Sequence, residues 1–247
     1  MSDTAPVFLV AELPASETFV LDGSEGHHAA AVRRLGPGSE LVVSDGVGGS
    51  AACVVSSAVG KDSLELRISR RWHVPAPALR IVLAQALVKG DRGELAVELA
   101  TETGVDSVVP WRASRCVARW DDGPRGAKAL ARWRSTAREA AKQSRRAWVP
   151  PVADPVSTTG LAALVRKAAL AVVLEAAAPS GLTDLDLPAD GDVLVVVGPE
   201  GGISEGELIA LREAGAQVAR LGPTVLRAST APAAAIAALG VLTTRWR

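Results

Sequence analysis

The sequence contains little cysteine, no long apolar run and neither of the common phosphate-binding signatures. Its two cysteines, Cys53 and Cys116, lie outside any spacing that binds a metal ion, so we expect reduced, partly buried thiols and no metal site. No run approaches the ~18 apolar residues of a membrane-spanning helix. The first residues, MSDTAPVFLVAELP, also lack the basic start of a signal peptide. We therefore expect a cytoplasmic protein with no membrane contact.

The net charge is zero, but the charges are unevenly distributed. Between Arg119 and Arg146 there are nine Lys or Arg against three Asp or Glu, whereas Asp154 to Glu213 holds ten acidic residues against three basic ones. Such a basic segment is typical of a protein that presents one face to a polyanion, and equally of a solvated amphipathic helix.

Residues 1–73 are rich in predicted β-structure. Five short apolar or alternating runs are separated by Gly, Asp and Ser turns, which predicts a small β-barrel. The exception is 26–35, GHHAAAVRRL, which predicts a short helix. His27, His28, Arg33 and Arg34 cluster there; adjacent histidines without a carboxylate or cysteine are poorly placed for a metal. They indicate either RNA contacts or ordinary surface residues.

Residues 73–78, HVPAPA, are expected to link two domains, and strands alternate with helices after them. Asp91 and Glu94 predict a helix start, and residues 124–147 form a long basic helical pattern. The alternation predicts an α/β domain with a mostly parallel sheet over residues 74–247.

The most informative stretch is 192–208, DVLVVVGPEGGISEGEL. Its apolar start predicts a strand buried on both faces, and Ser204 with Glu207 predicts a capping box for the following helix. The glycine loop between them, Gly198–Gly202, is neither a G-x-G-x-x-G fingerprint nor a lysine-containing phosphate loop. An adenosine-like ligand that lacks a pyrophosphate fits better.

Two other loops follow predicted strands. Leu174-Glu175 ends one strand, and Leu221–Arg227 lies between a strand and the last helix. Because the carboxyl ends of parallel strands meet at one edge, all three loops are expected to converge on one ligand.

These motifs resemble a known family. GPEGGISEGE followed by LGPTVLRASTAPAAAIAAL is similar to the RsmE-type 16S ribosomal RNA uridine-N3 methyltransferases of the SPOUT class. GHHAAAVRRLGPGSELVVSDGVGG looks like that family's PUA-like RNA-binding barrel, and QALVKGDRGELAVELATETGVDSVVP and REAAKQSRRAWVP look like parts of its catalytic domain.

The resemblance covers essentially the whole chain. It implies a PUA-like barrel over 1–73, a SPOUT α/β trefoil-knot domain over 74–247, a homodimer, S-adenosyl-L-methionine as cofactor and 16S ribosomal RNA of the small subunit as partner.

The resemblance also directs attention to particular residues. Arg227 is expected to stabilise the charge that develops on the uridine ring, since a guanidinium stays protonated and cannot be a base. Glu200 is a candidate base or a loop organiser. The expected cofactor-binding residues are Leu174, Glu175, Gly198, Pro199, Glu200, Gly201, Gly202, Ile203, Leu221, Gly222, Leu226 and Ala231. The expected RNA-binding residues are His27, His28, Arg33, Arg34, Arg132, Arg138, Lys142, Arg145 and Arg146.

Three matters stay open at this point. Ser229 replaces a glutamate that the family usually carries, so no role of that glutamate is transferred. Trp120, Trp133 and Trp148 flank the basic segment and either stack on an extruded base or pack in a core or dimer interface. The alternatives in function are a non-catalytic RNA-binding homologue, a methyltransferase for another RNA base, and an unrelated nucleotide-dependent enzyme.

Overall fold

The chain divides into two compact units, which the computed structural model describes over residues 5–246. The first unit contains the residues up to Ala76 together with Ala141–Val149, and the second contains Pro77–Ala140 and the residues from Pro150 onward. The sequence places the division after residue 73. It does not predict that residues 141–149 return to the first unit.

The first unit is built on one five-stranded sheet. Its strands are β1 (Val7–Leu9), β2 (Thr18–Leu21), β3 (Glu40–Ser44), β4 (Gly49–Ala58) and β5 (Leu64–His73). Their order is β1-β3-β4-β5-β2, with β1 parallel to β3 and the other pairs antiparallel. Over the described residues β1 and β2 are the two edges of the sheet and do not pair with each other, so the predicted small barrel is present as an open, mixed half-barrel sheet.

Alternating side chains bury one face of this sheet. Leu41 and Val43 of β3, Cys53 of β4 and Leu66 of β5 belong to one apolar core. The predicted helix at 26–35 begins earlier, as α1 (Gly23–His27), and continues as a wider π-helical turn, η1 (His28–Val32). Gly26 permits this close packing, because a Cβ there would lie 2.5 Å from the carbonyl oxygen of Leu21.

Residues 141–149 are held on the first unit by hydrogen bonds at several points. The backbone N–H of Gly48 donates to Ala147 O at 2.9 Å, that of Val149 donates to Gly46 O at 2.9 Å, and Trp148 Nε1 donates to Val74 O at 2.9 Å. The long helix α3 (Pro124–Gln143) leads into this segment and ends four residues before the predicted end at residue 147.

The end of α3 has an unusual backbone. The N–H of Arg146 donates to Ala141 O and that of Arg145 to Lys142 O, the paired bonds that close a helix around a left-handed residue. Arg145 is that residue, with φ of 55°. Glycine is the usual choice, since a left-handed conformation costs other residues roughly 1–2 kcal/mol.

The second unit contains a fully parallel five-stranded sheet. Its strands are β6 (Leu79–Ala86), β7 (Ser107–Trp111), β8 (Leu170–Leu174), β9 (Gly191–Val197) and β10 (Gln217–Ala219). Their order is β10-β8-β9-β6-β7, so the prediction of an α/β domain with a parallel sheet is confirmed.

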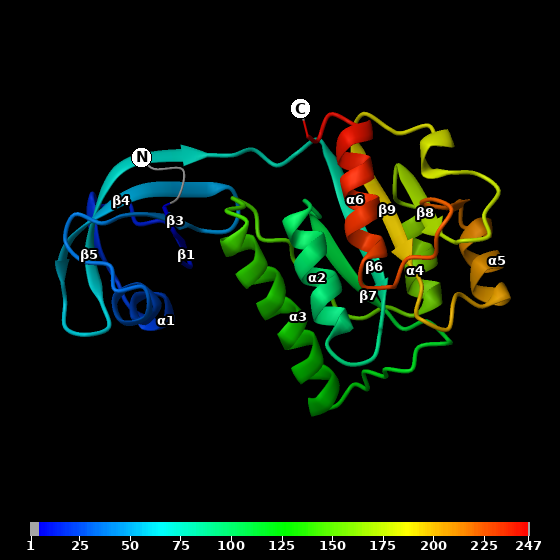
Figure 1. Ribbon diagram of the computed structural model, residues 1–247, viewed down its shortest axis with the longest axis horizontal. Coiled ribbons are helices and arrows are strands. Elements are labelled where there is room, and N and C mark those ends of the chain that lie inside the picture. The colour runs from blue at the N-terminus through cyan, green and yellow to red at the C-terminus, as the bar shows by residue number, and fades with distance from the viewer. Residues whose placement is uncertain (1–4, 247) are drawn as a thin grey trace. The chain divides into compact units, whose positions relative to one another are not determined.

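Helices cover both faces of this sheet. In β9, Val193, Val195 and Val197 belong to one core with α2 (Arg92–Glu102), α3 and α6 (Ala231–Leu242), whereas Leu194 and Val196 belong to a second core with α4 (Thr158–Val165) and α5 (Glu205–Glu213). A short 3-10 turn, η2 (Leu182–Asp184), follows β8. Figure 1 shows α2 and α6 on one side of the strands and α4 and α5 toward the other.

The two predicted helix starts have different outcomes. The α5 capping box is confirmed: the Glu207 carboxylate accepts a bond of 3.1 Å from the backbone N–H of Ser204. At α2 the Asp91 side chain makes no capping bond. Glu94 is instead engaged by Arg132 Nε at 2.9 Å, so the predicted cap is wrong although the helix forms.

Candidate cofactor and substrate site

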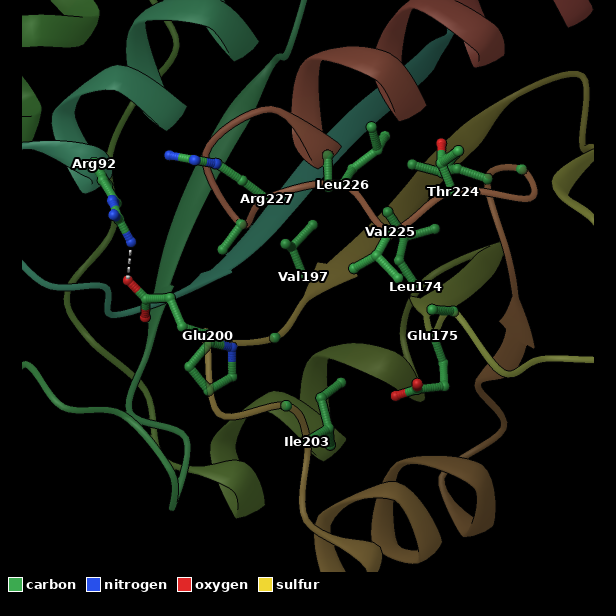
Figure 2. A pocket seen from close by; sticks show the side chains of 18 residues that line it. Arg92, Leu174, Glu175, Val197, Glu200, Ile203, Thr224, Val225, Leu226 and Arg227 are labelled. Atoms are coloured by element: carbon green, nitrogen blue, oxygen red, sulfur yellow. Dashed lines mark hydrogen bonds and ion pairs between the residues drawn. The ribbon is translucent and has the colours of Figure 1, made fainter.

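The loops that follow β8, β9 and β10 enclose a cavity of about 530 Å³ in the second unit (Figure 2). This is the convergence that the parallel strands predict. All the predicted cofactor-binding residues except Gly201 line the cavity. The lining residues also include Arg92, Ala176, Val197, Thr224, Val225, Arg227 and Ala228.

The cavity has apolar walls and charged residues at separate places along its rim. Leu174, Val197, Ile203 and Leu226 supply aliphatic surface from four different elements and loops. Figure 2 shows the carboxylate of Glu175 apart from Arg92, Glu200 and Arg227, which lie toward the opposite side of the view. An apolar chamber with a few polar groups is typical of a small-molecule site.

Close packing determines the shape of the glycine loop. A Cβ at Gly198 would lie 2.6 Å from Cγ1 of Ile203, and Gly202 has φ of 74°, so each position favours glycine. Gly201 faces away from the cavity, where its carbonyl oxygen accepts a hydrogen bond of 3.2 Å from Arg115. The loop after β7, which carries Arg115, therefore packs against the outer side of the glycine loop.

The charged end combines residues from two loops and the first residue of α2. Arg92 Nη1 lies 3.4 Å from Glu200 Oε1, and the exposed Arg227 comes from the loop before α6. The sequence reasoning missed Arg92. Its signal was available, because Arg92 follows β6, whose carboxyl end belongs to the same edge of the sheet.

A buried carboxylate, that of Glu207, ties the glycine loop to its neighbours. It accepts bonds from Ser114 N at 2.7 Å, Ser114 Oγ at 2.8 Å, Ser204 Oγ at 2.7 Å and Thr158 Oγ1 at 3.0 Å, besides the backbone N–H of Ser204. Burial alone would raise the pKa of Glu207, but the hydrogen bonds from Ser204 and Ser114 outweigh it and lower the pKa below its usual value. Glu207 is thus a structural anion.

Ser229 does not reach the cavity. It is 3% exposed and lies in the turn before α6, whereas the neighbouring Ala228 and Ala231 line the cavity. The position where the family usually carries glutamate therefore contributes no charge to this site.

The predicted RNA-binding residues fall into several places. In the first unit, His27 Nδ1 lies 2.8 Å from Asp62, His28 packs edge-on against Phe8, and Arg33 and Arg34 are exposed. After the end of α3, Arg145 is exposed and Arg146 is half-buried. In the second unit, Arg138 is exposed and Arg132 is paired with Glu94.

Lys142 requires a correction. Its side chain is only 5% exposed, and its ammonium lies 3.0 Å from Glu25 Oε1. A buried amine bound to a carboxylate is not available to a phosphate, so we remove Lys142 from the predicted RNA-binding set.

The three tryptophans beside the basic segment serve packing. Trp133 is 2% exposed and stacks edge-to-face with Trp120 at 4.8 Å between ring centroids, and Trp148 packs edge-on against His73. None of them lines the cavity described above.

The sequence also made predictions about metal binding, membrane spans and the two cysteines. Over residues 5–246 no cluster of His, Cys, Asp and Glu has the geometry to hold a metal ion. None of the helices described is long and apolar enough to cross a membrane. Burial raises the pKa of the Cys53 thiol to about 11, against the opposing charge of Arg71, and burial also raises the pKa of Cys116.

Two family models match the chain. Residues 75–240 match an RNA methyltransferase domain, and residues 21–69 match an RNA methyltransferase PUA domain. The chain is 50% identical to the ribosomal RNA small subunit methyltransferase E of Mycobacterium tuberculosis, over 98% of this chain and 94% of that protein. It is 32% identical to the protein of the same name from Bacillus subtilis, over 94% of this chain and 93% of that protein.

Solved structures agree with these sequence matches. A ribosomal RNA small subunit methyltransferase E from Neisseria gonorrhoeae, bound to S-adenosyl methionine, superposes with a TM-score of 0.85 at 30% identity, over 97% of this chain and 98% of that chain. A methyltransferase from Legionella pneumophila, with its bound cofactor SAM, gives a TM-score of 0.85 at 27% identity over the same shares.

Proposed function

The chain belongs to the ribosomal RNA small subunit methyltransferase E family, and on that premise we propose that it methylates uridine N3 in 16S ribosomal RNA of the small subunit, with S-adenosylmethionine as methyl donor. The observation that carries the proposal is the cavity at the carboxyl edge of the parallel sheet, where an apolar chamber ends beside Arg92, Glu200 and Arg227.

The residues present fit S-adenosylmethionine. A volume of about 530 Å³ suits a nucleoside-sized ligand, and the aliphatic walls from Leu174, Ile203 and Leu226 suit an adenine ring. The Glu175 carboxylate can accept hydrogen bonds from ribose hydroxyls. The glycine loop allows backbone groups to approach the ligand closely. When bound, S-adenosylmethionine supplies an electrophilic methyl group on its sulfonium sulfur.

The chain's own contribution is to align the uridine and to accommodate its charge. Uridine N3 carries a proton that must leave before or during attack, and the resulting negative charge is shared with O2 and O4. Arg227, on the loop before α6, is placed to stabilise that charge by a preorganised interaction. Fixing both reactants in one cavity contributes to the rate enhancement through orientation.

Glu200 has two candidate roles, and its ion pair with Arg92 helps to distinguish them. The ion pair of 3.4 Å with Arg92 holds the carboxylate at the charged end of the cavity. We assign Glu200 primarily to holding the glycine loop in shape, with proton acceptance from N3 as the alternative, and Arg92 to positioning it.

The proposal extends to the whole assembly. We assign residues 1–73 to RNA binding as a PUA-like domain and residues 74–247 to the methyltransferase domain, with its C-terminal chain forming the trefoil knot of the SPOUT class. We propose a homodimer, supported by apolar side chains exposed at the end of α6, Val241 at 65% and Leu242 at 42%. We also propose a cytoplasmic location, because the proposed substrate is ribosomal RNA of the small subunit.

The test is methyl transfer to isolated small ribosomal subunits that lack the modification. With labelled S-adenosylmethionine, nucleoside analysis should recover the label as N3-methyluridine, and light scattering should give the mass of a dimer. Label in another nucleoside would mean a different target base. Binding of both ligands without any transfer would identify a non-catalytic RNA-binding homologue.

A further inference from the structure

A second cavity lies within the first unit. Its volume is about 380 Å³, within the range of ligand pockets, and it lies beside β1, β3, β4 and the end of β5. The segment after α3 completes it. The lining residues are Ala5, Val7, Val42, Ser44, Ser50, Trp72, Val74, Arg145, Arg146 and Ala147.

Arg145 reaches this cavity from a strained position. It is the left-handed residue that closes α3, with φ of 55°, where glycine would meet the backbone requirement at lower cost. It is exposed, and its side chain has no hydrogen-bond or ion-pair partner among residues 5–246. Strain retained at a cavity wall indicates that the side chain serves a purpose there.

Trp72 supplies an aromatic surface to the same cavity. It is half-buried, and the guanidinium of Arg70 lies 4.9 Å from the centroid of its ring. Indole rings bind unpaired nucleotide bases by stacking, and nearby arginines add a cation–π contribution and attract phosphate. The cavity therefore combines the aromatic surface of Trp72 with the exposed guanidinium of Arg145.

We propose that this cavity binds one unpaired nucleotide of RNA, with its base against Trp72 and its phosphate at Arg145. An acidic protein segment would bind the arginines but would not need the aromatic ring. The presence of both an arginine and a tryptophan in one cavity therefore favours RNA. The inference rests on the proposed function, because it gives the RNA substrate a contact outside the methyl-transfer cavity.

The first test separates binding from folding. The full chain is titrated into a fluorescein-labelled single-stranded RNA of about twelve nucleotides, and anisotropy is measured at several salt concentrations. Arg145→Gly should weaken binding and reduce the slope of log K against log salt by about 0.7, the value for one lost phosphate contact on a single strand. Its thermal stability should match or exceed that of the wild type, because glycine suits the left-handed conformation.

Arg67→Ala is the matched control. Arg67 is exposed on β5 and does not line the cavity, so removing its charge should leave the affinity nearly unchanged. Equal losses from the two variants would mean that only general charge attraction acts and would overturn the proposal.

The second test addresses the base. Trp72→Leu should weaken single-stranded binding roughly 5- to 100-fold, whereas Trp72→Phe should retain most of it because a ring remains. A duplex of the same sequence should bind without sensitivity to either change. In addition, an RNA carrying 4-thiouridine should crosslink to the peptide that contains Trp72.

The two proposals can fail separately. If wild-type protein modifies small subunits but Arg145→Gly and Trp72→Leu bind RNA normally, the nucleotide site is wrong and the proposed function stands. If the variants weaken RNA binding while wild type transfers no methyl group, the proposed function is wrong. If a polyglutamate peptide competes with the RNA for the wild-type protein, and the same variants abolish that competition, the cavity binds an acidic protein segment instead of RNA.

Discussion

Replacing the buried carboxylate of Glu207 is the most direct test of how the glycine loop is held in place. Its two oxygens accept hydrogen bonds from two backbone N–H groups, those of Ser114 and Ser204, at 2.7 and 3.1 Å. In Glu207→Gln one oxygen becomes an NH₂ group. Whichever way the amide turns, one backbone N–H then faces a donor, while the serine and threonine hydroxyls can rotate to adapt.

The expected loss in the free energy of unfolding follows from that one unpaired backbone N–H. A buried donor left without an acceptor costs about 1–3 kcal/mol, and loss of a negative charge in the first turn of α5 adds about 0.3–1 kcal/mol. We therefore expect a loss of about 2 kcal/mol and a fall in Tm of roughly 4–8 °C for a chain of this size. Because Ser204 follows the glycine loop, the Kd for S-adenosylmethionine should rise as well.

The pH dependence has a definite sign. Hydrogen bonds from Ser204 and Ser114 lower the pKa of Glu207 from the ordinary value of 4.5, although burial acts in the opposite direction. The stabilisation from its ionised form is therefore complete above 4.5 and is lost as the pH falls through the lower, folded-state pKa. The difference between wild type and Glu207→Gln should be constant between about pH 5.5 and 7 and shrink below about pH 4.

Urea denaturation at these pH values measures the effect. Glu213→Gln is the control, because Glu213 lies on the same helix and is exposed, so its free energy of unfolding should change by less than about 0.5 kcal/mol. Unchanged stability of Glu207→Gln at neutral pH would refute the reasoning. A difference that persists unaltered at about pH 3.5 would refute the assignment of an ionised carboxylate.

Four further outcomes follow from the same structure. Arg227→Ala should lower kcat about 10²- to 10³-fold in the subunit methylation assay while calorimetry finds an unchanged Kd for S-adenosylmethionine; full turnover would exclude its charge-stabilising role. Lys142→Met should destabilise the protein by about 3–5 kcal/mol in urea, because it removes the ammonium from the largely buried Glu25 carboxylate, and the double variant with Glu25→Leu should recover most of that loss. Gly198→Ala places a Cβ 2.6 Å from Ile203, so the Kd for S-adenosylmethionine should rise at least about tenfold; normal binding would mean that the loop adapts. Because burial raises the pKa of Cys53 to about 11, native protein should show little alkylation of that thiol by iodoacetamide at about pH 8, and rapid alkylation there would contradict its burial.

Local sequence determined the elements and the family. The apolar run 192–197 becomes β9, Ser204 and Glu207 start α5 as predicted, and the alternation of strands with helices specifies a parallel sheet. These features are predictable because each depends on residues a few positions apart. The convergence of three loops also follows from the sequence, since parallel strands place their carboxyl ends along one edge.

Long-range packing decided the remaining features. The helical pattern of 124–147 does not reveal that its last residues leave the second unit, or that the ammonium of Lys142 becomes buried against Glu25. Charge alone predicted Lys142 as a surface residue, because burial depends on a partner 117 positions away. The position of Arg92 at the carboxyl edge of the sheet was predictable, but its ion pair with Glu200 was not. Trp72 and Arg145 line one cavity although they lie far apart in the sequence.

The glycine loop illustrates the division best. Its sequence indicated a permissive backbone there and predicted that a ligand approaches it. Only the tertiary structure decided that Gly201 faces away toward Arg115, that Glu200 is paired with Arg92, and that Glu207 anchors the loop through Ser114. The physical reason is that backbone freedom is a local property, whereas the partners of a charge are supplied by whichever distant segments the fold packs beside it.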